Sequence, residues 1–446
     1  MRLLDENRRY VMTYEEAKEY LVEVSQSGIV LGLDTMRELL ARLDNPQEKL
    51  QFVHIAGTNG KGSTLAFIST ILQCAGYTVG RYASPRVFEY EEFVQVNGEN
   101  IAREAMCRYV KQIKDAIAAM EADGFARPTL FEVETAIGFL YFVEMECDVV
   151  VLECGMGGRD DATNIVDNIL CNVLTPIGLD HIGFLGETLE EITEVKAGII
   201  KNRAPVCMAK QQKRARRVIE KVCGRMGCPL IPTDDTRLHV YEELEYAEDG
   251  APMIHFDYKY FTDLKIRLIG RYQVDNACLA IETAKVLDDW GLNVTTEHIR
   301  EGLAKAVWPG RFDTVAMKPQ VIIDGAHNPH GMVQLKDSLE YYFPGKRVIG
   351  VMGVLADKAY DEECEMMAPV FDKFFTITPP ANPRALEAEK LAAVLKEYHK
   401  DVTACESVEA AVDTALKEAK EEDVIVIFGS LSYIGEACKI VKKLTR

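Results

Sequence analysis

The sequence predicts an α/β protein in which a doubly wound, phosphate-loop ATP-binding domain is followed by a smaller Rossmann-like α/β domain. A short apolar run at 51–56 leads into a glycine-rich turn that carries a lysine. Apolar runs of strand length then alternate with helical segments, and the alternation restarts after a Pro-Gly break at 309–310. Because strands that alternate with helices pair in parallel and are covered on both faces, this pattern predicts two such sheets in succession.

The glycine-rich turn has the composition of a loop that binds a nucleotide triphosphate. Its glycines, Gly57, Gly60 and Gly62, allow backbone N–H groups to point at phosphate oxygens, and Lys61 adds a positive charge. The hydroxyl of Ser63 or Thr64 can reach a magnesium ion. The loop is a variant, since the common Walker pattern has Ser or Thr directly after the lysine. The alternative is a plain strand-to-helix turn with an exposed lysine.

Composition and charge exclude several classes of protein. A chain of 446 residues fits three domains of ordinary size or two larger ones. The net charge of −19 disfavours nonspecific binding to nucleic acid or to an anionic membrane. The 12 cysteines contain no Cys-x-x-Cys pair, which indicates reduced thiols rather than disulfides or zinc. With no leader-like N-terminus and no apolar run of membrane-spanning length, we expect a cytoplasmic protein without a membrane or nucleic-acid partner.

The first domain is expected to comprise residues 1–306. We predict strands at 51–56, 78–83, 148–153, 169–175 and 205–209, and helices at 63–75, 103–123, 130–146, 188–200, 272–290 and 295–306. The run at 148–152 is continuously apolar, as in a central parallel strand. The segment 238–269 alternates aromatic and polar residues around Asp249-Gly250, which predicts an antiparallel hairpin region.

The second domain is expected to comprise residues 313–446, after a linker at 307–312 that contains Pro309-Gly310. We predict strands near 320–324, 347–352, 374–378 and 424–428, and helices near 331–342, 360–370, 385–398 and 407–419. This unit has no phosphate loop of its own. Since ligands of such sheets lie beyond the carboxyl ends of the strands, a cleft between the two domains is the expected site.

Polar residues at predicted strand ends are further candidates for chemistry. Glu153 ends an apolar strand and can bind Mg²⁺ there, the alternative being a solvated loop carboxylate. His181 follows another strand, although a lone histidine is more often simply packed. Asp324 and His327 stand on one turn after strand 320–323, where ordinary turn chemistry is the alternative. By themselves, Ser84 before Pro85 is a turn and Lys196 is a surface lysine of a helix.

Taken together, the motifs resemble the folylpolyglutamate synthase family, which includes bifunctional dihydrofolate synthases and belongs with the Mur ligases. The resemblance covers nearly the whole chain. It rests on Leu31-Gly-Leu, Asn45-Pro-Gln, Gly57-Thr-Asn-Gly-Lys-Gly-Ser, Ser84-Pro85, Gly157-Gly-Arg, Asp161-Ala-Thr-Asn, Asp180-His181, Lys196-Ala-Gly-Ile-Ile-Lys, Gly270-Arg-Tyr-Gln-Val-Asp-Asn, Trp308-Pro-Gly-Arg-Phe, Asp324-Gly-Ala-His-Asn-Pro and Gly429-Ser-Leu.

The resemblance implies an ATP-dependent amide ligase that adds L-glutamate to folate, or to dihydropteroate, through an acyl phosphate. It implies two Mg²⁺ ions and a carboxylated Lys196 as a metal ligand. A monomer is the default expectation for a chain that carries its own two-domain cleft. By this resemblance the catalytic residues are Lys61, Lys196, His181, Asp324 and His327. ATP is bound by Thr58, Asn59, Gly60, Lys61, Gly62, Ser63, Thr64, Asn276, Arg311 and Asp324. The metal ligands are Ser63, Ser84, Glu153, His181 and Lys196. The acceptor is bound near Leu31, Gly32, Thr129, Phe131 and Asp161.

Two departures from the family pattern concern the acceptor. The family more often has Ser-Pro-His-Leu where this chain has Ser-Pro-Arg86-Val87, and Arg-Leu-Asp where it has Arg159-Asp160-Asp161. We therefore expect Arg86 to pair with a substrate carboxylate. Two other functions stay open at this point: a Mur-type ligase with a peptidoglycan or cyanophycin-like acceptor, and a noncatalytic nucleotide-binding protein or regulatory ATPase.

Overall fold

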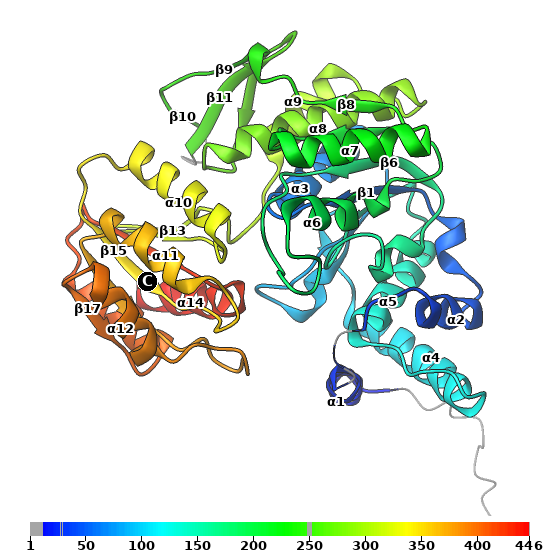
Figure 1. Cartoon of the computed structure of the whole chain (residues 1–446), viewed down its shortest axis with the longest axis horizontal. Helices are drawn as coiled ribbons and strands as arrows, with labels where there is room; N and C mark the ends of the chain where they lie inside the picture. The colour runs from blue at the N-terminus through cyan, green and yellow to red at the C-terminus, as the bar shows by residue number, and fades with distance from the viewer. Residues whose placement is uncertain (1–11, 27, 29, 248–251, 446) are drawn as a thin grey trace, which may run out of the picture.

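The computed structural model describes residues 12–26, 28, 30–247 and 252–445. Figure 1 shows two units side by side, one built from the blue to light-green part of the chain and the other from the yellow to red part, with a small antiparallel sheet at the edge of the first unit. The described residues contain no helix that is long and apolar enough to cross a membrane.

The described part of the first unit is organised around an eight-stranded sheet with the order β4-β3-β2-β5-β1-β6-β7-β8. All neighbours from β2 to β8 pair in parallel, whereas β3 and β4 form an antiparallel edge. The strands are β1 (Phe52–Ala56), β2 (Val79–Tyr82), β3 (Val94–Val96), β4 (Glu99–Asn100), β5 (Val149–Glu153), β6 (Ile169–Leu174), β7 (Val206–Met208) and β8 (Leu230–Pro232).

Alternate residues of β1 pack into different cores, which is why this strand is apolar throughout. Phe52 belongs to a core with helices α4 and α5, while Val53 and Ile55 belong to a core with α3, α8 and α9 on the opposite face. The sheet is therefore covered on both faces, as a doubly wound fold requires. The helices of this unit are α1 (Tyr14–Ser25), α2 (Asp34–Arg42), α3 (Lys61–Cys74), α4 (Arg103–Ala122), α5 (Leu130–Glu144), α6 (Leu189–Lys196), α7 (Lys213–Met226), α8 (Tyr272–Asp289) and α9 (Thr296–Lys305).

The predicted hairpin region forms the small antiparallel sheet. Its strands are β9 (Leu238–Val240), β10 (Glu245–Tyr246), β11 (Pro252–Tyr258) and β12 (Phe261–Ile266). The turn predicted at Asp249-Gly250 lies outside the described residues. The longest described pairing joins β11 to β12 through a tight turn at Lys259 and Tyr260.

The second unit is a six-stranded sheet with the order β13-β14-β18-β15-β16-β17 within the described chain. It is parallel except for β13, which pairs antiparallel with β14 at one edge. Its strands are β13 (Asp313–Met317), β14 (Gln320–Ile323), β15 (Val348–Met352), β16 (Lys373–Thr376), β17 (Val402–Ala404) and β18 (Val424–Phe428), and its helices are α10 (Pro329–Tyr342), α11 (Tyr360–Met367), α12 (Ala388–Tyr398), α13 (Val408–Glu418) and α14 (Leu431–Leu444).

The structure confirms the predicted α/β class and the predicted strands and helices in their order. The prediction did not include the helices α1, α2, α7 and α14 or the strands β3, β4, β8, β13 and β17. The predicted linker coincides with the turn between α9 and β13. We propose the domain boundary there.

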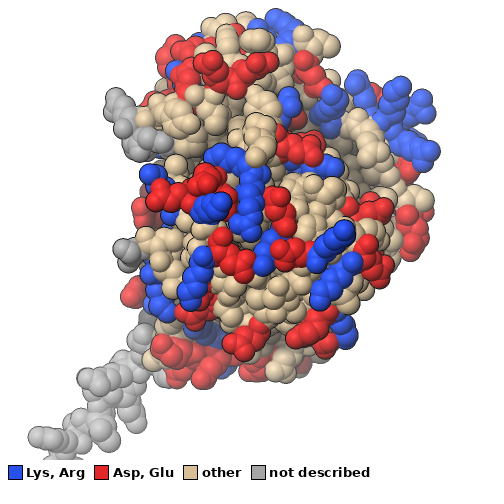
Figure 2. Space-filling view, turned by 90° about the vertical axis from the view of Figure 1, so that its left-hand side faces the viewer, with Lys and Arg blue, Asp and Glu red and all other residues tan. Residues whose placement is uncertain are grey.

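The face of the second unit that is turned away from the first carries mixed charge. Figure 2 shows acidic and basic side chains interspersed over the centre of this face. Within the second unit, ion pairs join Lys373 to Glu418 at 2.8 Å and Lys443 to Glu409 at 3.0 Å. Such a surface has no broad field of one sign with which to attract a polyanion.

Candidate active site

Loops at the carboxyl ends of β1, β2, β5 and β6 meet the second unit across a cleft. The predicted phosphate loop follows β1, Ser84 follows β2, and Glu153 is the last residue of β5. Residues from both units line the cleft: Thr58, Asn59, Gly60, Lys61, Gly62, Ser63, Ser84, Glu153, Asp180, His181, Tyr272, Arg311, Asp324 and His327. Most of the residues predicted to bind ATP or metal therefore lie around one space.

The phosphate loop can take its shape only because it has glycine at two tightly packed positions. Gly57 has φ +155°, and a Cβ there would lie 1.8 Å from Thr175 Oγ1. Gly60 has φ +86°, and a Cβ there would lie 2.4 Å from Asn276 Oδ1. Asn276 thus lies beneath the loop rather than among the residues that line the cleft. The loop keeps its turn free of side chains, as close approach to phosphate requires.

Helix α3 begins at Lys61, so its N-terminal N–H groups face the cleft. Gly62, in its first turn, is covered by the indole of Trp308 from the linker, and an added Cβ would lie 2.7 Å from that ring. The buried hydroxyl of Thr64 has no hydrogen-bond partner among the described residues. The first turn therefore offers backbone and side-chain donors to an anion, which fits phosphate.

Lys61 and Glu153 face each other in the cleft, with Lys61 Nζ 3.8 Å from Glu153 Oε1. Lys61 Nζ also donates to the carbonyl of Thr58 at 3.2 Å. Burial raises the pKa of Glu153 to about 7, although the positive charge of Lys61 opposes this shift. A buried carboxylate with one distant cation as its partner is suited to a divalent metal.

Lys196 is buried behind the phosphate loop, at the end of α6, and is not a surface lysine. Its Nζ donates to the carbonyl of Gly57 at 2.9 Å. Burial, with a contribution from the nearby charge of Lys61, lowers the pKa of Lys196 to about 7. A substantial fraction of this amine is therefore neutral and nucleophilic at neutral pH.

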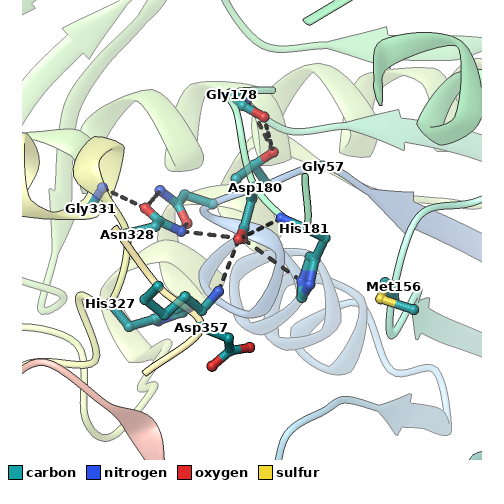
Figure 3. A network of polar contacts seen from close by, with 12 residues as sticks. Gly57, Met156, Gly178, Asp180, His181, His327, Asn328, Gly331 and Asp357 are labelled. Carbon is teal, nitrogen blue, oxygen red and sulfur yellow. Dashed lines mark hydrogen bonds and ion pairs between the residues drawn. The ribbon is translucent and has the colours of Figure 1, made fainter. Parts of the chain in front are cut away.

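Asp180 connects the two units, and Figure 3 shows it at the centre of a polar network. Its carboxylate accepts from Lys358 Nζ at 2.9 Å and from Asn328 Nδ2 at 3.4 Å, both from the second unit. His181 Nε2 lies 3.8 Å from the same carboxylate. Burial lowers the pKa of His181, so its imidazole is neutral at pH 7 and able to bind a metal.

Asn59 of the phosphate loop also contacts the second unit. Its side-chain amide lies 3.0 Å from the amide of Asn328 and 2.8 Å from His330 Nδ1. Thr58, one residue earlier, instead hydrogen-bonds within the first unit, to Gly178 at 3.1 Å. The phosphate loop is thus directly coupled to the position of the second unit.

Asp324 and His327 are held rigidly on the second unit. The carboxylate of Asp324 accepts from the N–H groups of Phe312 and Ala326, each at 2.7 Å, and from the Tyr272 hydroxyl at 3.3 Å. His327 Nδ1 lies 2.7 Å from the carbonyl of Gly325, so Nδ1 carries the proton and Nε2 is free to accept. Burial lowers the pKa of His327 to about 4.

The predicted acceptor residues line a second cavity of about 280 Å³, which shares Ser84, Pro85 and Gly155 with the cleft. Leu31, Gly32, Thr129, Phe131 and Asp161 all belong to its wall. Asp161 accepts from the N–H of Met156 at 2.8 Å and from that of Thr163 at 3.0 Å. The cavity is mostly apolar, and its wall also contains the acidic residues Glu132, Asp160 and Asp161. This is a suitable lining for a flat heterocycle with N–H donors.

Arg86 does not join that cavity. Its guanidinium donates to Glu134 at 2.7 Å and lies over the ring of Tyr90 at 4.1 Å. A substrate carboxylate would have to compete with Glu134 for it, so the predicted role of Arg86 has no support from the geometry. Sequence reasoning also missed Tyr272, Asn328, Lys358 and the Trp308 contact, each of which joins segments far apart in the chain.

The phosphate loop, the strand-end carboxylate and the cross-cleft Asp324 together define a two-domain ligase of the Mur type. The family model "Mur ligase middle domain" matches residues 55–284, and "Mur ligase, glutamate ligase domain" matches residues 310–431. The chain is 35% identical over 437 residues to dihydrofolate synthase/folylpolyglutamate synthase of Bacillus subtilis, covering 96% of this chain and 99% of that protein. It therefore belongs to the dihydrofolate synthase/folylpolyglutamate synthase family of Mur ligases.

Other relatives and solved structures agree. Folylpolyglutamate synthase of Lacticaseibacillus casei is 33% identical over 96% of this chain and 98% of that protein. The Mycobacterium tuberculosis enzyme complexed with ADP and AMPPCP superposes with a TM-score of 0.85 at 28% identity, covering 97% of this chain and 99% of that one. The structure of Escherichia coli FolC in complex with DHPP and ADP superposes with a TM-score of 0.82 at 30% identity, covering 96% of this chain and 98% of that one.

Proposed function

We propose that this enzyme uses ATP to join L-glutamate to a folate, and that it also accepts dihydropteroate. The observation that carries the proposal is the single cleft in which the phosphate loop and Glu153 face Asp324 and His327 of the other unit. The acceptor cavity opens beside Ser84, at the edge of this cleft. An acceptor held there would present its carboxylate toward the γ-phosphate of ATP.

The chemistry follows from the poor leaving group of a carboxylate. Attack by an amine would have to expel oxide, so ATP first transfers its γ-phosphoryl group to the carboxylate. Lys61 and the N-terminus of α3 stabilise the negative charge on that group. The amine of glutamate then attacks the acyl phosphate, an amide forms, and phosphate leaves. No residue of the chain has to act as a nucleophile.

The residues at the cleft fit magnesium and a modified lysine. Ser63, Ser84, Glu153, His181 and Lys196 would hold two Mg²⁺ ions, which supply positive charge to the transferred phosphoryl group. The neutral amine of Lys196 fits carboxylation by CO₂, which would convert it from a cation into an anionic ligand. In that form it would share the metal site with Glu153 rather than repel it.

The second unit would complete the site only when it is closed on the first. Asp324, His327 and Arg311 would contact ATP, with Thr58, Asn59, Gly60, Gly62, Thr64 and Asn276 shaping the loop beneath it. The pairs Asp180–Lys358 and Asn59–Asn328 hold this closed arrangement. Closure before reaction limits hydrolysis of the acyl phosphate by water.

The proposal is tested by the products of the purified full chain. Dihydropteroate and tetrahydrofolate are each incubated with L-glutamate, ATP and Mg²⁺, and products are identified by mass spectrometry alongside phosphate release. We expect glutamyl adducts from both acceptors and none from Lys61→Met. ATP turnover independent of glutamate and folate, or ligation of a UDP-muramyl acceptor instead, would overturn the proposal.

Location and assembly complete the proposal. The described cysteines are all free thiols, which supports a reducing compartment and hence the cytoplasm. One chain carries both halves of the cleft, so we propose that the monomer is the active form.

A further inference from the structure

A larger cavity, of about 760 Å³, lies next to the nucleotide cleft, and the proposed mechanism assigns no ligand to it. Its wall is formed by α3, the loop after β2, the end of α9 and the linker. It shares Ser84, Glu153 and Arg311 with the cleft, so the two spaces are continuous at the site of phosphoryl transfer. A molecule in this cavity could reach the reacting atoms.

Arg81, on β2, is a buried cation in the wall of this cavity. The residue is 8% exposed, and its side chain donates to Thr70 Oγ1 at 2.8 Å. Its buried Nε has no hydrogen-bond partner, and no acidic side chain pairs with it, among the residues that the structure describes. The buried Nε2 of Gln73, also in the wall, has no partner in that part of the chain either.

Most of the other charged groups in this wall are partnered. Lys305 pairs with Glu301 on α9, and Arg86 pairs with Glu134. Glu92 accepts from backbone N–H groups of the loop after Ser84. Arg311 also has no ion pair among the described residues, but it is only partly buried and is shared with the nucleotide cleft. Arg81 is the buried cation of this wall, and its guanidinium has several unused donors and no acidic partner in that part of the chain.

An unpaired buried guanidinium costs stability, because the lost hydration is not replaced by an acid. Burial alone lowers the pKa of Arg81 to about 10, from an ordinary value of 12.5. Helix α3 covers this face of β2, and an apolar side chain could pack there without losing the hydration of a charge. The arginine is best explained by a ligand that supplies the missing anion.

We propose that Arg81, which is held in place by Thr70, binds a carboxylate of a glutamyl group in this cavity together with Gln73. The inference rests on the proposed function. Arg81 precedes Ser84 by three residues, about 10 Å along an extended chain, so a short glutamyl chain can bridge the two positions. A guanidinium with several free donors matches a carboxylate in geometry as well as in charge. The carboxylate comes either from the incoming L-glutamate or from the tail of an acceptor that is already glutamylated.

Steady-state kinetics of Arg81→Met, Arg81→Lys and Lys305→Met test the proposal. Loss of a charged hydrogen-bond partner is expected to raise the affected KM at least about tenfold, with kcat within about twofold. Arg81→Lys should recover part of the loss. Lys305→Met, which removes an ion-paired cation from the same wall, should match the wild type.

The choice of acceptor distinguishes the two sources of the carboxylate. If Arg81 binds the incoming amino acid, KM for glutamate rises with dihydropteroate and with tetrahydrofolate diglutamate alike. If it binds the acceptor tail, KM rises only for the diglutamate, because dihydropteroate has no glutamyl group. Either result supports a carboxylate site at Arg81. Unchanged KM values for glutamate, dihydropteroate and tetrahydrofolate diglutamate would overturn the proposal.

A binding measurement separates failure of this inference from failure of the proposed function. The thermal unfolding of wild type and Arg81→Met is followed with L-glutamate or γ-glutamylglutamate, without ATP. We expect Arg81→Met to be at least as stable as wild type when no ligand is present, and to lose the rise in Tm that one of the two ligands causes in wild type. A variant that is folded and keeps the full rise in Tm refutes the site, whether or not the wild type ligates folate.

Discussion

Glu363, in α11 of the second unit, should make this protein less stable as the pH rises. The residue is fully buried, and neither carboxylate oxygen has a hydrogen-bond partner among the described residues. Burial raises its pKa from 4.5 to about 7, although Lys358 opposes the shift. We predict that Glu363→Gln, which imitates the protonated acid, removes this pH dependence.

The magnitude follows from the pKa shift. Below pH 4.5 the carboxyl group is protonated in both the folded and the unfolded state. Between pH 4.5 and 7 only the folded state keeps the proton, so stability falls as pH rises and is constant above pH 7. A shift from 4.5 to about 7 corresponds to a total loss of about 3.5 kcal/mol at about 1.4 kcal/mol per pH unit.

The measurement is urea unfolding of wild type and Glu363→Gln between pH 5 and pH 8. The stability of the variant relative to wild type should increase by about 2.5 kcal/mol between pH 5 and pH 8, because part of the loss occurs below pH 5. Glu362→Gln is the matched control, since Glu362 is exposed on the same helix, and it should leave the difference constant. If wild type and Glu363→Gln lose stability in parallel, the buried carboxyl group is not protonated in the folded state and the reasoning fails.

Three further predictions concern the cleft. Gly62→Ala would place a Cβ 2.7 Å from the Trp308 indole, so we expect ATP to bind about tenfold or more weakly in a fluorescence titration. Lys358→Met leaves the buried Asp180 carboxylate unpaired, and we expect at least a tenfold loss of kcat/KM and a larger radius of gyration by small-angle X-ray scattering. In the proposed site, Mg²⁺ binds Glu153 and displaces a proton from this carboxyl group, whose pKa is about 7. The proposal therefore predicts that the Mg²⁺ concentration for half-maximal phosphate release falls severalfold from pH 6 to pH 7 and levels off above that.

Each of these changes has a matched control. Gly224→Ala, in α7, adds a Cβ that meets nothing within 4 Å, so it should keep nucleotide affinity and gain up to about 1 kcal/mol of stability. Lys390→Met removes an exposed cation from the second unit and should change neither kcat/KM nor the scattering profile. Glu153→Gln should abolish the pH dependence of the Mg²⁺ requirement. An unchanged ATP titration in Gly62→Ala, an unchanged profile in Lys358→Met, or a Mg²⁺ requirement independent of pH in wild type would contradict the corresponding prediction.

The sheets and the phosphate loop were predictable because their signals are local. A continuously apolar run such as 148–152 identifies a central parallel strand, and the glycines after β1 mark a turn that side chains cannot occupy. The carboxyl ends of parallel strands lie at one edge of a sheet, so the sequence alone could place Glu153 and His181 near the phosphate loop.

The contacts between the units were not predictable in the same way. Lys358 and Asp180 are 178 positions apart, and neither lies in a pattern that identifies the other. The environment of Lys196 was also hidden, since a helix-end lysine is usually solvated and only the fold buries it behind Gly57. Arg81 is different, because its signal is local. All four residues of β2 are buried, and a charged side chain breaks the apolar pattern expected of such a strand. A residue that conflicts with the pattern of its own element often has a function.

The position of β1 has a consequence for how the chain is made. Its partners come late in the sequence: Phe52 pairs with Val150 of β5, and Ile55 pairs with Val173 of β6. A ribosome releases the chain from its N-terminus, so the glycine turn emerges well before either neighbour that supports it. About a hundred further residues must be synthesised before β1 can enter its sheet, and until then this apolar strand depends on chaperones or on transient collapse for protection.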